Sequence, residues 1–434
     1  MGNAQSRSGE PVGLFCGLAV LDVVQLVDEP PGPDEKTTAL DQVVAAGGPA
    51  TNAAVTFAAL GGRALLAAPV GKGPLAALVR ADLAAQGVEL IDCTASASGS
   101  RPAASPTRPR DRRPVGGSGR AGGVGGGSAP AAGGAPGALS VSSCIVSAGT
   151  GQRSVVSTNA RLPVDPAPLV GFGRAVAAGR APAPDVVLVD GHNPALARVA
   201  LNMAEATGAR RVMDAGSWKD DAADLLGRCD VVAASARFRP PGAADRPDEV
   251  AAWLLGRGVP AVVITRGQQG ALWWRAGAAG SAGPADNAGD ARDAGDGAPT
   301  GSTGATGAPV AHGSVGAPAV AVVDTLGAGD AFHGALAYVL ATGAGGPAEG
   351  GAGESCSYES YEPGPGARTA VTAVENGEHV EDAEGRARSG PKTVALGAGA
   401  LEAAVRRACR IAAVSTTTLG TRAWLDHVRT TTSA

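Results

Sequence analysis

Short apolar runs and amphipathic segments of helical period alternate along most of the chain. The apolar runs predict strands over residues 13–27, 64–70, 185–189, 211–213, 230–234, 261–265 and 319–323. The amphipathic segments predict helices over residues 53–60, 75–86, 194–207, 220–226, 247–256, 331–340 and 398–418. This order is typical of an α/β fold, in which a parallel sheet with right-handed crossovers has helices on both faces.

A different pattern occurs near residue 150. Residues 140–147 and 153–157 alternate apolar and polar positions around Gly149-Thr150-Gly151. Alternation on both sides of a glycine-rich turn predicts a β-hairpin. We expect this hairpin to form a small β element beside the main sheet.

Three biased blocks interrupt the α/β pattern, at about residues 95–138, 276–318 and 343–392. They hold much of the chain's 66 glycines and 31 prolines and few large apolar side chains. Such segments bury too little apolar surface to offset the entropy of ordering the chain. We therefore expect a disordered leader over residues 1–10, one domain over 11–425 with three disordered insertions in surface loops, and a tail over 426–434.

Composition narrows the classes of function. The formal net charge is −4, which gives no sign of a nucleic-acid-binding surface. The six cysteines are scattered without a C-x-x-C pair, as in proteins with reduced thiols, and no apolar run is long enough to span a membrane. We expect a cytoplasmic protein. The first residues fit the pattern M-G-x-x-x-[ST], so an acylated Gly2 that tethers the chain to a membrane is an alternative to a disordered leader.

The most informative stretch spans residues 323–330 and reads Val-Asp-Thr-Leu-Gly-Ala-Gly-Asp. It lies between a predicted strand and a predicted helix, so its backbone N–H groups and the helix dipole would converge on one point, which suits an anion. Asp330 would stand beside that point as a potential base, an arrangement suited to phosphoryl transfer. The alternative is a structural connection in which Asp330 is only a helix N-terminal carboxylate. The sequence contains no P-loop motif G-x-x-x-x-G-K-[ST].

Upstream, Gly47 and Gly48 precede a predicted helix whose first turn contains Asn52. The glycines would bring the backbone close to a ligand, and the amide of Asn52 offers both a donor and an acceptor to a hydroxyl-rich molecule. Asp22 interrupts an apolar strand, where a carboxylate is costly unless it has a partner or lies at the strand's end. Other polar residues, such as Asp190 and Asp214, follow predicted strands at the edge where parallel sheets bind ligands.

Two of these motifs together resemble the signatures of the ribokinase-like (PfkB) carbohydrate kinase family. Residues 324–330 match D-T-x-G-A-G-D, and Gly47, Gly48 and Asn52 match G-G-x-x-x-N. The resemblance covers roughly residues 11–94, 139–274, 319–342 and 393–425, and it is closest to ketohexokinase and fructose-type sugar kinases. It implies a three-layer α/β/α sandwich with a mostly parallel central sheet and a small β-sheet lid. A monomer and a homodimer formed through that lid are both left open.

The resemblance also implies a role for each matching residue. Asp330 would be the catalytic base on the acceptor hydroxyl, and Gly327, Ala328 and Gly329 would form the anion hole. The sugar would be bound by Asp22, Asp34, Gly47, Gly48, Asn52 and Arg153. The nucleotide would be bound by Thr265, Gly267 and Gly270, which match T-x-G-x-x-G, and by Thr325. ATP with Mg²⁺ is implied as phosphoryl donor, because the phosphate charge needs neutralising.

Some positions depart from the family pattern. Pro49 stands where ketohexokinase has an asparagine that touches the sugar, and residues 235–238 lack the N-x-x-E segment that organises magnesium. The Mg²⁺ ligands therefore stay unassigned. Three alternatives remain open. The first is a ketohexose kinase. The second is a kinase for another acceptor (ribose, a nucleoside, a 2-keto-3-deoxy sugar acid or sulfofructose), and the third is a kinase-fold protein that acts as a binding or regulatory module.

Overall fold

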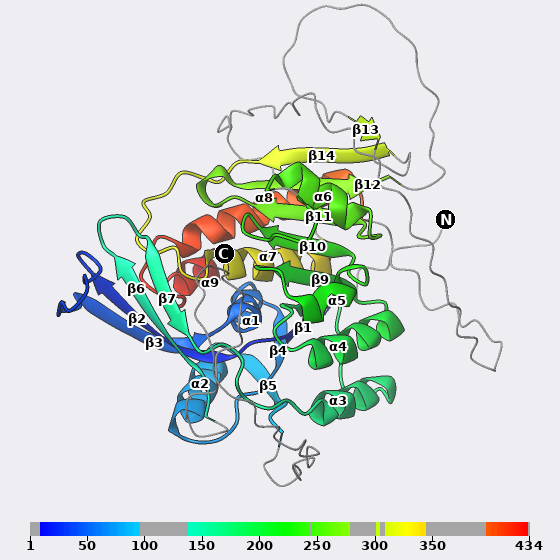
Figure 1. Ribbon diagram of the computed structural model, residues 1–434. Coiled ribbons are helices and arrows are strands. Elements are labelled where there is room, and N and C mark those ends of the chain that lie inside the picture. The colour runs from blue at the N-terminus through cyan, green and yellow to red at the C-terminus, as the bar shows by residue number, and fades with distance from the viewer. Residues whose placement is uncertain are drawn as a thin grey trace, which may run out of the picture.

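The computed structural model describes residues 9–95, 138–243, 245–277, 301–303, 309–343 and 396–432. These residues form a central sheet of ten strands in the order β13-β14-β12-β11-β10-β9-β8-β1-β4-β5 (Figure 1). The strands are β1 (Val12–Cys16), β4 (Arg63–Ala68), β5 (Val88–Asp92), β8 (Val186–Val189), β9 (Arg210–Ala215), β10 (Val231–Ser235), β11 (Ala261–Thr265), β12 (Ala271–Ala276), β13 (Gly301–Thr303) and β14 (Pro309–Val315).

The sheet is parallel from β5 to β11, and its last three strands are added in antiparallel pairs. In the middle of the sheet, Phe15 pairs with Leu66 on one side and with Leu188 on the other. These three side chains belong to one core cluster, whereas the alternate positions Leu14 and Leu65 belong to a second cluster. The sheet therefore buries both faces, as a parallel sheet requires.

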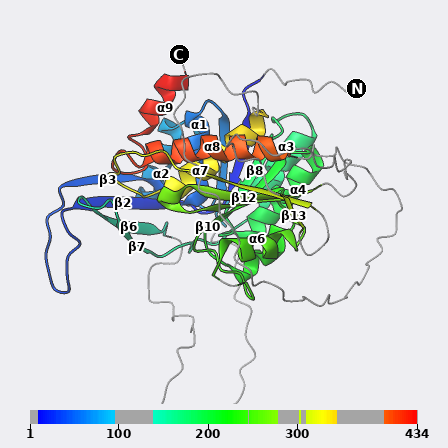
Figure 2. The ribbon, with the colours of Figure 1, turned by 90° about the horizontal axis from the view of Figure 1, so that it is seen from above.

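Helices cover the two faces in separate layers (Figure 2). One layer consists of α1 (Pro49–Ala59), α2 (Pro74–Ala85), α7 (Ala328–Thr342), α8 (Ala398–Ser415) and α9 (Leu425–Thr432). The other consists of α3 (Ala167–Ala177), α4 (Pro194–Thr207), α5 (Ala223–Leu226) and α6 (Pro247–Leu255). Single 3₁₀ turns lie at η1 (Asp220–Ala222) and η2 (Gly267–Gln269). Helices α1, α2, α4 and α6 begin with a proline, whose fixed φ suits the first helical position.

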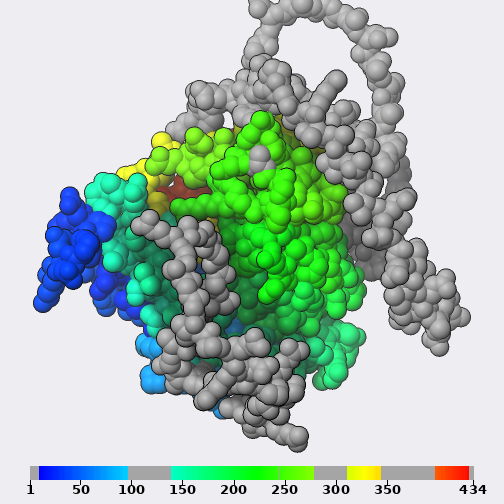
Figure 3. Space-filling model, in the orientation of Figure 1, coloured from blue at the N-terminus to red at the C-terminus, as the bar shows by residue number. Residues whose placement is uncertain are grey.

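A second sheet projects to one side of this sandwich (Figures 1 and 3). It contains β2 (Val20–Val27), β3 (Asp41–Gly47), β6 (Val141–Ser147) and β7 (Arg153–Ser157), in the order β3-β2-β6-β7. Strands β6 and β7 pair antiparallel, which confirms the hairpin expected from the sequence. The three-layer sandwich with a mostly parallel sheet and a small β lid is therefore confirmed.

Two strand predictions need correction. The apolar run 13–27 is not one strand, because the chain leaves the central sheet after β1 and enters the lid as β2. The predicted strand at 319–323 is wrong. Those residues are irregular and mostly partly exposed, and the N–H of Val323 donates to the carbonyl of Thr416 (2.8 Å) rather than to a strand.

The missing strand position is taken by β14, which lies inside the block 276–318 that we expected to be disordered. Strand β13 also lies there, and β12 extends to Ala276. The sequence of β14 was not recognised as a strand because Gly313 interrupts its apolar pattern. A Cβ at Gly313 would lie 2.8 Å from the indole of the buried Trp273, so the missing side chain leaves room for that ring.

The sequence pattern also missed β3, β5, α3 and α9, which the structure contains. Gly2 and most of the three biased blocks lie outside the described residues. Within the described residues, no helix has the length and apolar character needed to cross a membrane.

Candidate active site

Helix α7 begins at the glycine turn singled out in the sequence. Gly327 caps it with a φ of 74°, a left-handed conformation that glycine adopts without strain. Ala328 and Gly329 form the first turn with Asp330, and the first N–H groups of a helix lack partners inside the helix. A Cβ at Gly329 would meet nothing within 4 Å, so the backbone is open to an approaching anion. The N–H of Ala328 lies 3.4 Å from the carbonyl oxygen of Thr325, so the accessible part of the turn is the backbone at Gly329.

The shape of this turn depends on Asp324, whose side chain is 1% exposed. Its Oδ1 accepts a hydrogen bond from the N–H of Leu326 (2.7 Å), and its Oδ2 accepts one from the N–H of Gly420 (2.9 Å). The carboxylate thus ties the turn to the loop that follows α8. Behind the turn, a Cβ at Gly327 would lie 2.7 Å from Cγ2 of Thr421, so no larger residue fits there without movement.

Asn52 and Asp330 meet where α1 packs against α7. Nδ2 of Asn52 donates a hydrogen bond of 2.9 Å to Oδ2 of Asp330. The two helices approach closely because Gly334 has no side chain: a Cβ there would lie 2.4 Å from the carbonyl oxygen of Ala53. The structure therefore brings together the two residues that carry the two sequence signatures.

Arg422 completes this contact, and the sequence analysis assigned it no role. Its guanidinium donates to Oδ1 of Asn52 (3.3 Å), to the carbonyl of Ala46 (2.6 Å) and to Oδ2 of Asp82 (2.9 Å). Because a carbonyl oxygen must face the arginine, the Asn52 amide turns its nitrogen toward Asp330. Arg422 follows Leu419-Gly420-Thr421 near the C-terminus, and its partners lie more than 300 residues away, so no local pattern marks it.

Asp22 lies on β2 and is 5% exposed. Its carboxylate occupies the space in front of Gly47, where a Cβ would come within 2.0 Å of it. Burial raises the pKa of Asp22 to about 6, although a hydrogen bond from Ser142 and the charge of Arg422 lower it. Gly48 caps α1 with a φ of 104°, close against the backbone of Leu18. Asp22, Gly47 and Gly48 are thus grouped at the start of α1.

Asp190, which follows β8, stabilises the backbone around this group. Its Oδ2 accepts hydrogen bonds from the N–H groups of Leu18 (2.8 Å) and Ala50 (3.2 Å). Asp190 therefore caps the N-terminus of α1 and holds the crossover between β1 and β2, which is a structural role. A Cβ at Gly17 would lie 2.1 Å from this carboxyl group, so glycine is required there as well.

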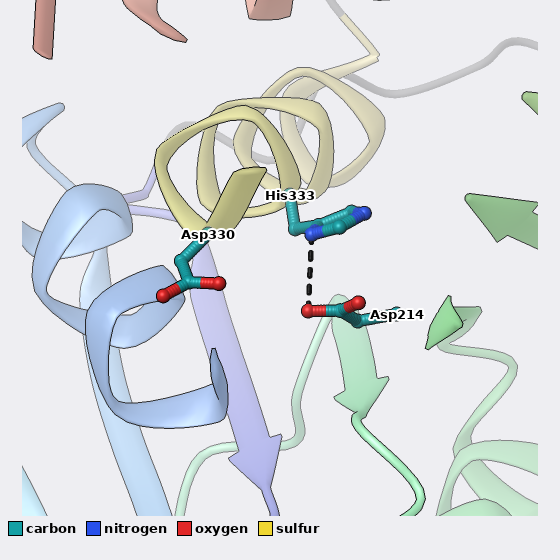
Figure 4. Close-up of side chains that lie close together, drawn as sticks. All are labelled: Asp214, Asp330 and His333. Carbon is teal, nitrogen blue, oxygen red and sulfur yellow. Dashed lines mark ion pairs between the residues drawn. The ribbon is translucent and has the colours of Figure 1, made fainter. Parts of the chain in front are cut away.

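Asp214, at the end of β9, and His333, on α7, lie beside Asp330 (Figure 4). Nδ1 of His333 is 3.0 Å from Oδ2 of Asp214, and both side chains are almost fully buried. Burial and the negative charge of Asp214 raise the pKa of Asp330 to about 6, while the Asn52 hydrogen bond and the charges of His333 and Arg153 lower it. A carboxylate with this pKa is ionised at neutral pH and is a better proton acceptor than an ordinary aspartate.

The lid reaches this turn through the β6–β7 hairpin. Nη1 of Arg153 donates to Oγ1 of Thr325 (2.9 Å), and Oγ1 of Thr325 donates to the carbonyl of Gly151 (3.1 Å). The side chain of Arg153 thus connects the lid to the glycine turn. Asp34 is not brought to the cluster: it lies in the exposed loop between β2 and β3, with a φ of 61°.

The T-x-G-x-x-G segment follows β11, at the same carboxyl edge as Asp214. Gly267 and Gly270 both have positive φ, 59° and 77°, and a Cβ at Gly270 would lie 2.0 Å from the carbonyl oxygen of Val315. Thr265 ends β11, and its hydroxyl lies 3.4 Å from the carbonyl of Ala234. The segment forms a tight turn at the edge where open α/β sheets bind ligands.

The described part of the chain offers no good protein site for Mg²⁺. One group of acidic and histidine side chains, Asp214, Asp330 and His333, has ligand atoms within 4.8 Å of one another. Mg²⁺ takes oxygen ligands and keeps several waters. An imidazole already paired with a carboxylate does not fit that preference, so these three residues are a poor match for Mg²⁺.

No protein-family model matches the sequence, and no curated protein matches it. The fold, in contrast, matches solved structures over nearly the whole chain. A ribokinase from Giardia lamblia is 13% identical with a TM-score of 0.59, and the match covers 98% of this chain and 99% of that one. A protein from Agrobacterium tumefaciens described as a ribokinase is 19% identical with a TM-score of 0.55, and the match covers 98% of both chains. At these identities the likeness establishes the fold, and it confirms the ribokinase-like architecture expected from the sequence.

Proposed function

We propose that this protein is a carbohydrate kinase that transfers the γ-phosphoryl group of ATP to a sugar hydroxyl, with Asp330 as the catalytic base. One observation carries the proposal. The Asp330 carboxylate, oriented by Asn52, stands in the first turn of α7, beside the open backbone of Gly329. A base and an anion hole therefore adjoin each other, as transfer of a phosphoryl group to an alcohol requires.

The chemistry at this point is a single displacement. The acceptor oxygen forms a bond to the γ-phosphorus as the bond between that phosphorus and the β,γ-bridging oxygen breaks, and ADP leaves. The hydroxyl proton passes to Asp330, which its pKa of about 6 keeps ionised above that pH. The N–H groups of the Gly327–Gly329 turn stabilise the charge on the transferring group, and positioning supplies much of the remaining rate.

The acceptor pocket is built from Asp22, Gly47, Gly48 and Asn52. A carboxylate and an amide side by side suit an acceptor that has several hydroxyl groups, and the two glycines let the Asp22 carboxylate and the Leu18 backbone pack closely around them. We propose a ketohexose as the acceptor. The other candidates are ribose, a nucleoside, a 2-keto-3-deoxy sugar acid and sulfofructose. Asp34 would contribute only if its loop moved toward the pocket.

The proposed nucleotide position runs from the α7 turn to the turn after β11. Thr325 would face the phosphates, while Thr265, Gly267 and Gly270 would line the nucleotide beyond them. Mg²⁺ would neutralise the phosphates when it arrives with ATP, held by the nucleotide and by water.

We further propose that the outer face of the lid is where two copies of the chain meet. Val44 and Val156 lie on the same face of this sheet, because Val44 is opposite Val23, Val23 opposite Ser143 and Ser143 opposite Val156, and they are 45% and 76% exposed. Exposed apolar side chains grouped on one sheet favour contact with a second apolar surface. Sedimentation velocity tests this point: a homodimer that dissociates in Val156→Lys supports it, and a monomer at all concentrations contradicts it.

The test of the proposed function is release of ADP with Mg²⁺-ATP across a panel of fructose, ribose, adenosine, 2-keto-3-deoxygluconate and sulfofructose. We expect sugar-dependent release of ADP and a phosphorylated product that mass spectrometry identifies by its added phosphate. Turnover of one panel member well above the others identifies the acceptor. Binding of sugar or ATP without any turnover would instead favour a binding or regulatory module.

A further inference from the structure

Asp330 and His333 are three residues apart on α7, so they lie on the same face of the helix. That face points toward the end of β9, where Asp214 meets the imidazole (Figure 4). Nδ1 of His333 and Oδ2 of Asp214 are 3.0 Å apart, with side chains only 4% and 5% exposed. Neither residue has a role in the proposed transfer step.

A buried carboxylate close to a second, partly buried one is unfavourable unless a positive charge offsets one of them. Burial lowers the pKa of His333, but the negative charges of Asp214 and Asp330 raise it above its ordinary value. The two negative charges favour the cationic form of the imidazole, which lies beside both carboxylates. Its charge acts in a poorly solvated place, where Coulomb interactions are strong.

The other elements around this cluster bring few charges. Asn52 on α1 and Arg153 on β7 both lower the pKa of Asp330. The carbonyl of Ala233 on β10 faces His333. At the neighbouring strand end, Nδ1 of His192 lies 3.2 Å from Asp190, and Asp214 also raises the pKa of His192. The second pair therefore lies within electrostatic range of the first.

We propose that Asp214 and His333 are positioning residues that set the charge state of the catalytic base: the buried imidazolium offsets Asp214 and so keeps Asp330 ionised at the pH of catalysis. This inference rests on the proposed function of Asp330. His333 is buried beneath the site and does not touch the reacting atoms, so it acts through Asp330. This role predicts that the effect of removing the His333 charge on the pH profile is reversed when the Asp214 charge is removed as well.

The test uses the pH dependence of kcat/KM in His333→Gln, Asp214→Asn and the double variant. In His333→Gln the charge of Asp214 is uncompensated. We therefore expect the acid limb of the profile, where kcat/KM falls with falling pH, to move up by about one pH unit, and kcat/KM at pH values below this limb to fall about tenfold. At pH 8.5 activity should stay within about threefold of wild type. In the double variant both charges are gone, and the limb should return to within about 0.3 units of the wild-type position.

A role in packing alone gives a different pattern, and either of two results overturns the proposal. One is that His333→Gln lowers activity by the same factor at every pH. The other is that the double variant keeps the displaced limb of His333→Gln or is worse than both single variants. Asp214→Asn alone should leave the limb in place or move it to lower pH, and a shift to higher pH contradicts the inference.

A second readout does not need activity. Imidazole resonances of the full chain, assigned to His333 by their loss in His333→Gln, should titrate above the ordinary histidine range and move down in Asp214→Asn. If this titration is found but no sugar is phosphorylated, the charge pair stands and the proposed function fails. If sugar is phosphorylated and His333 titrates unchanged in Asp214→Asn, the inference about the pair fails alone.

Discussion

Asn52 and Asp330 are 278 residues apart in the chain and share a hydrogen bond of 2.9 Å from Nδ2 to Oδ2. This bond joins the first turns of α1 and α7. Asn52 therefore has two roles in our account, because its amide lies in the proposed sugar pocket and also stabilises the ionised form of the base.

Asn52→Leu should weaken both roles. Without the amide donor the pKa of Asp330 rises further above about 6, so the acid limb of kcat/KM moves to higher pH. KM for the sugar should rise about tenfold, the cost of one hydrogen bond to a charged or polar group. Asn202→Leu is the matched control, since Asn202 bonds to Arg228 on the surface. A pH profile that matches wild type would contradict the role of Asn52.

Asp22→Asn should stabilise the protein while it weakens sugar binding. Burial raises the folded pKa of Asp22 from 3.8 to about 6. The ionised form therefore costs stability, and this cost appears as pH rises from about 4 to above 6. Above pH 6 the free energy of unfolding of Asp22→Asn should exceed that of wild type by roughly 1–3 kcal/mol, and the difference should vanish near pH 4.

Urea unfolding at several pH values measures this difference. Asp34→Asn is the control, because it makes the same chemical change at an exposed position in the loop between β2 and β3. The same two variants separate the sugar roles. A higher sugar KM in Asp22→Asn but not in Asp34→Asn fits the structure, whereas the reverse would place the pocket elsewhere.

Gly334→Ala should separate α1 from α7. The added Cβ would lie 2.4 Å from the carbonyl oxygen of Ala53, a backbone atom that cannot turn away. We expect a loss of about 1–3 kcal/mol in stability and a lower kcat, because Asn52 moves with α1. Gly399→Ala in α8 is the matched control: a Cβ there meets nothing within 4 Å, so stability should be unchanged or slightly higher. Equal effects of both substitutions on stability and kcat would contradict the claim that Gly334 allows the close approach of α1 and α7.

Arg153→Gln should loosen the lid over the glycine turn. It removes the 2.9 Å bond to Thr325 and a charge that lowers the pKa of Asp330. KM for ATP or sugar should rise about fivefold, as for one lost hydrogen bond, with a smaller effect on kcat. Arg198→Gln, which breaks an exposed ion pair with Asp224, should change neither value. An unchanged KM in Arg153→Gln would mean that the lid contact has no part in binding.

Local signals were sufficient for most of the fold. Periodicity and proline placement located α4 at the residues that the structure shows, and the glycine turn was recognised from its letters alone. The strand expected at 319–323 failed because its valines do not enter the sheet. They lie between the lid and α8, where Val322 is within 2.9 Å of the Cβ position of Gly151.

The candidate site was predictable only where motifs mark it. Asp330, Asn52 and Gly327 belong to the two sequence signatures. The roles of Arg422 and His333, in contrast, depend on contacts with residues that are distant in the sequence. Arg422 binds Asp82, and His333 faces Asp214. A sequence without an alignment carries no signal for such pairs, because the contact exists only after the chain has folded.

Phosphoryl transfer by Asp330→Asn is the most direct test of the central claim. Asparagine keeps the size of the side chain but cannot take the proton from the acceptor. With the preferred sugar and Mg²⁺-ATP at pH 8, we expect kcat to fall by roughly 10²–10⁴-fold while KM for the sugar changes little and the melting temperature does not fall. Wild-type activity should decline as pH falls through about 6. An Asp330→Asn variant with kcat near that of wild type would show that the proton goes elsewhere and would contradict the account.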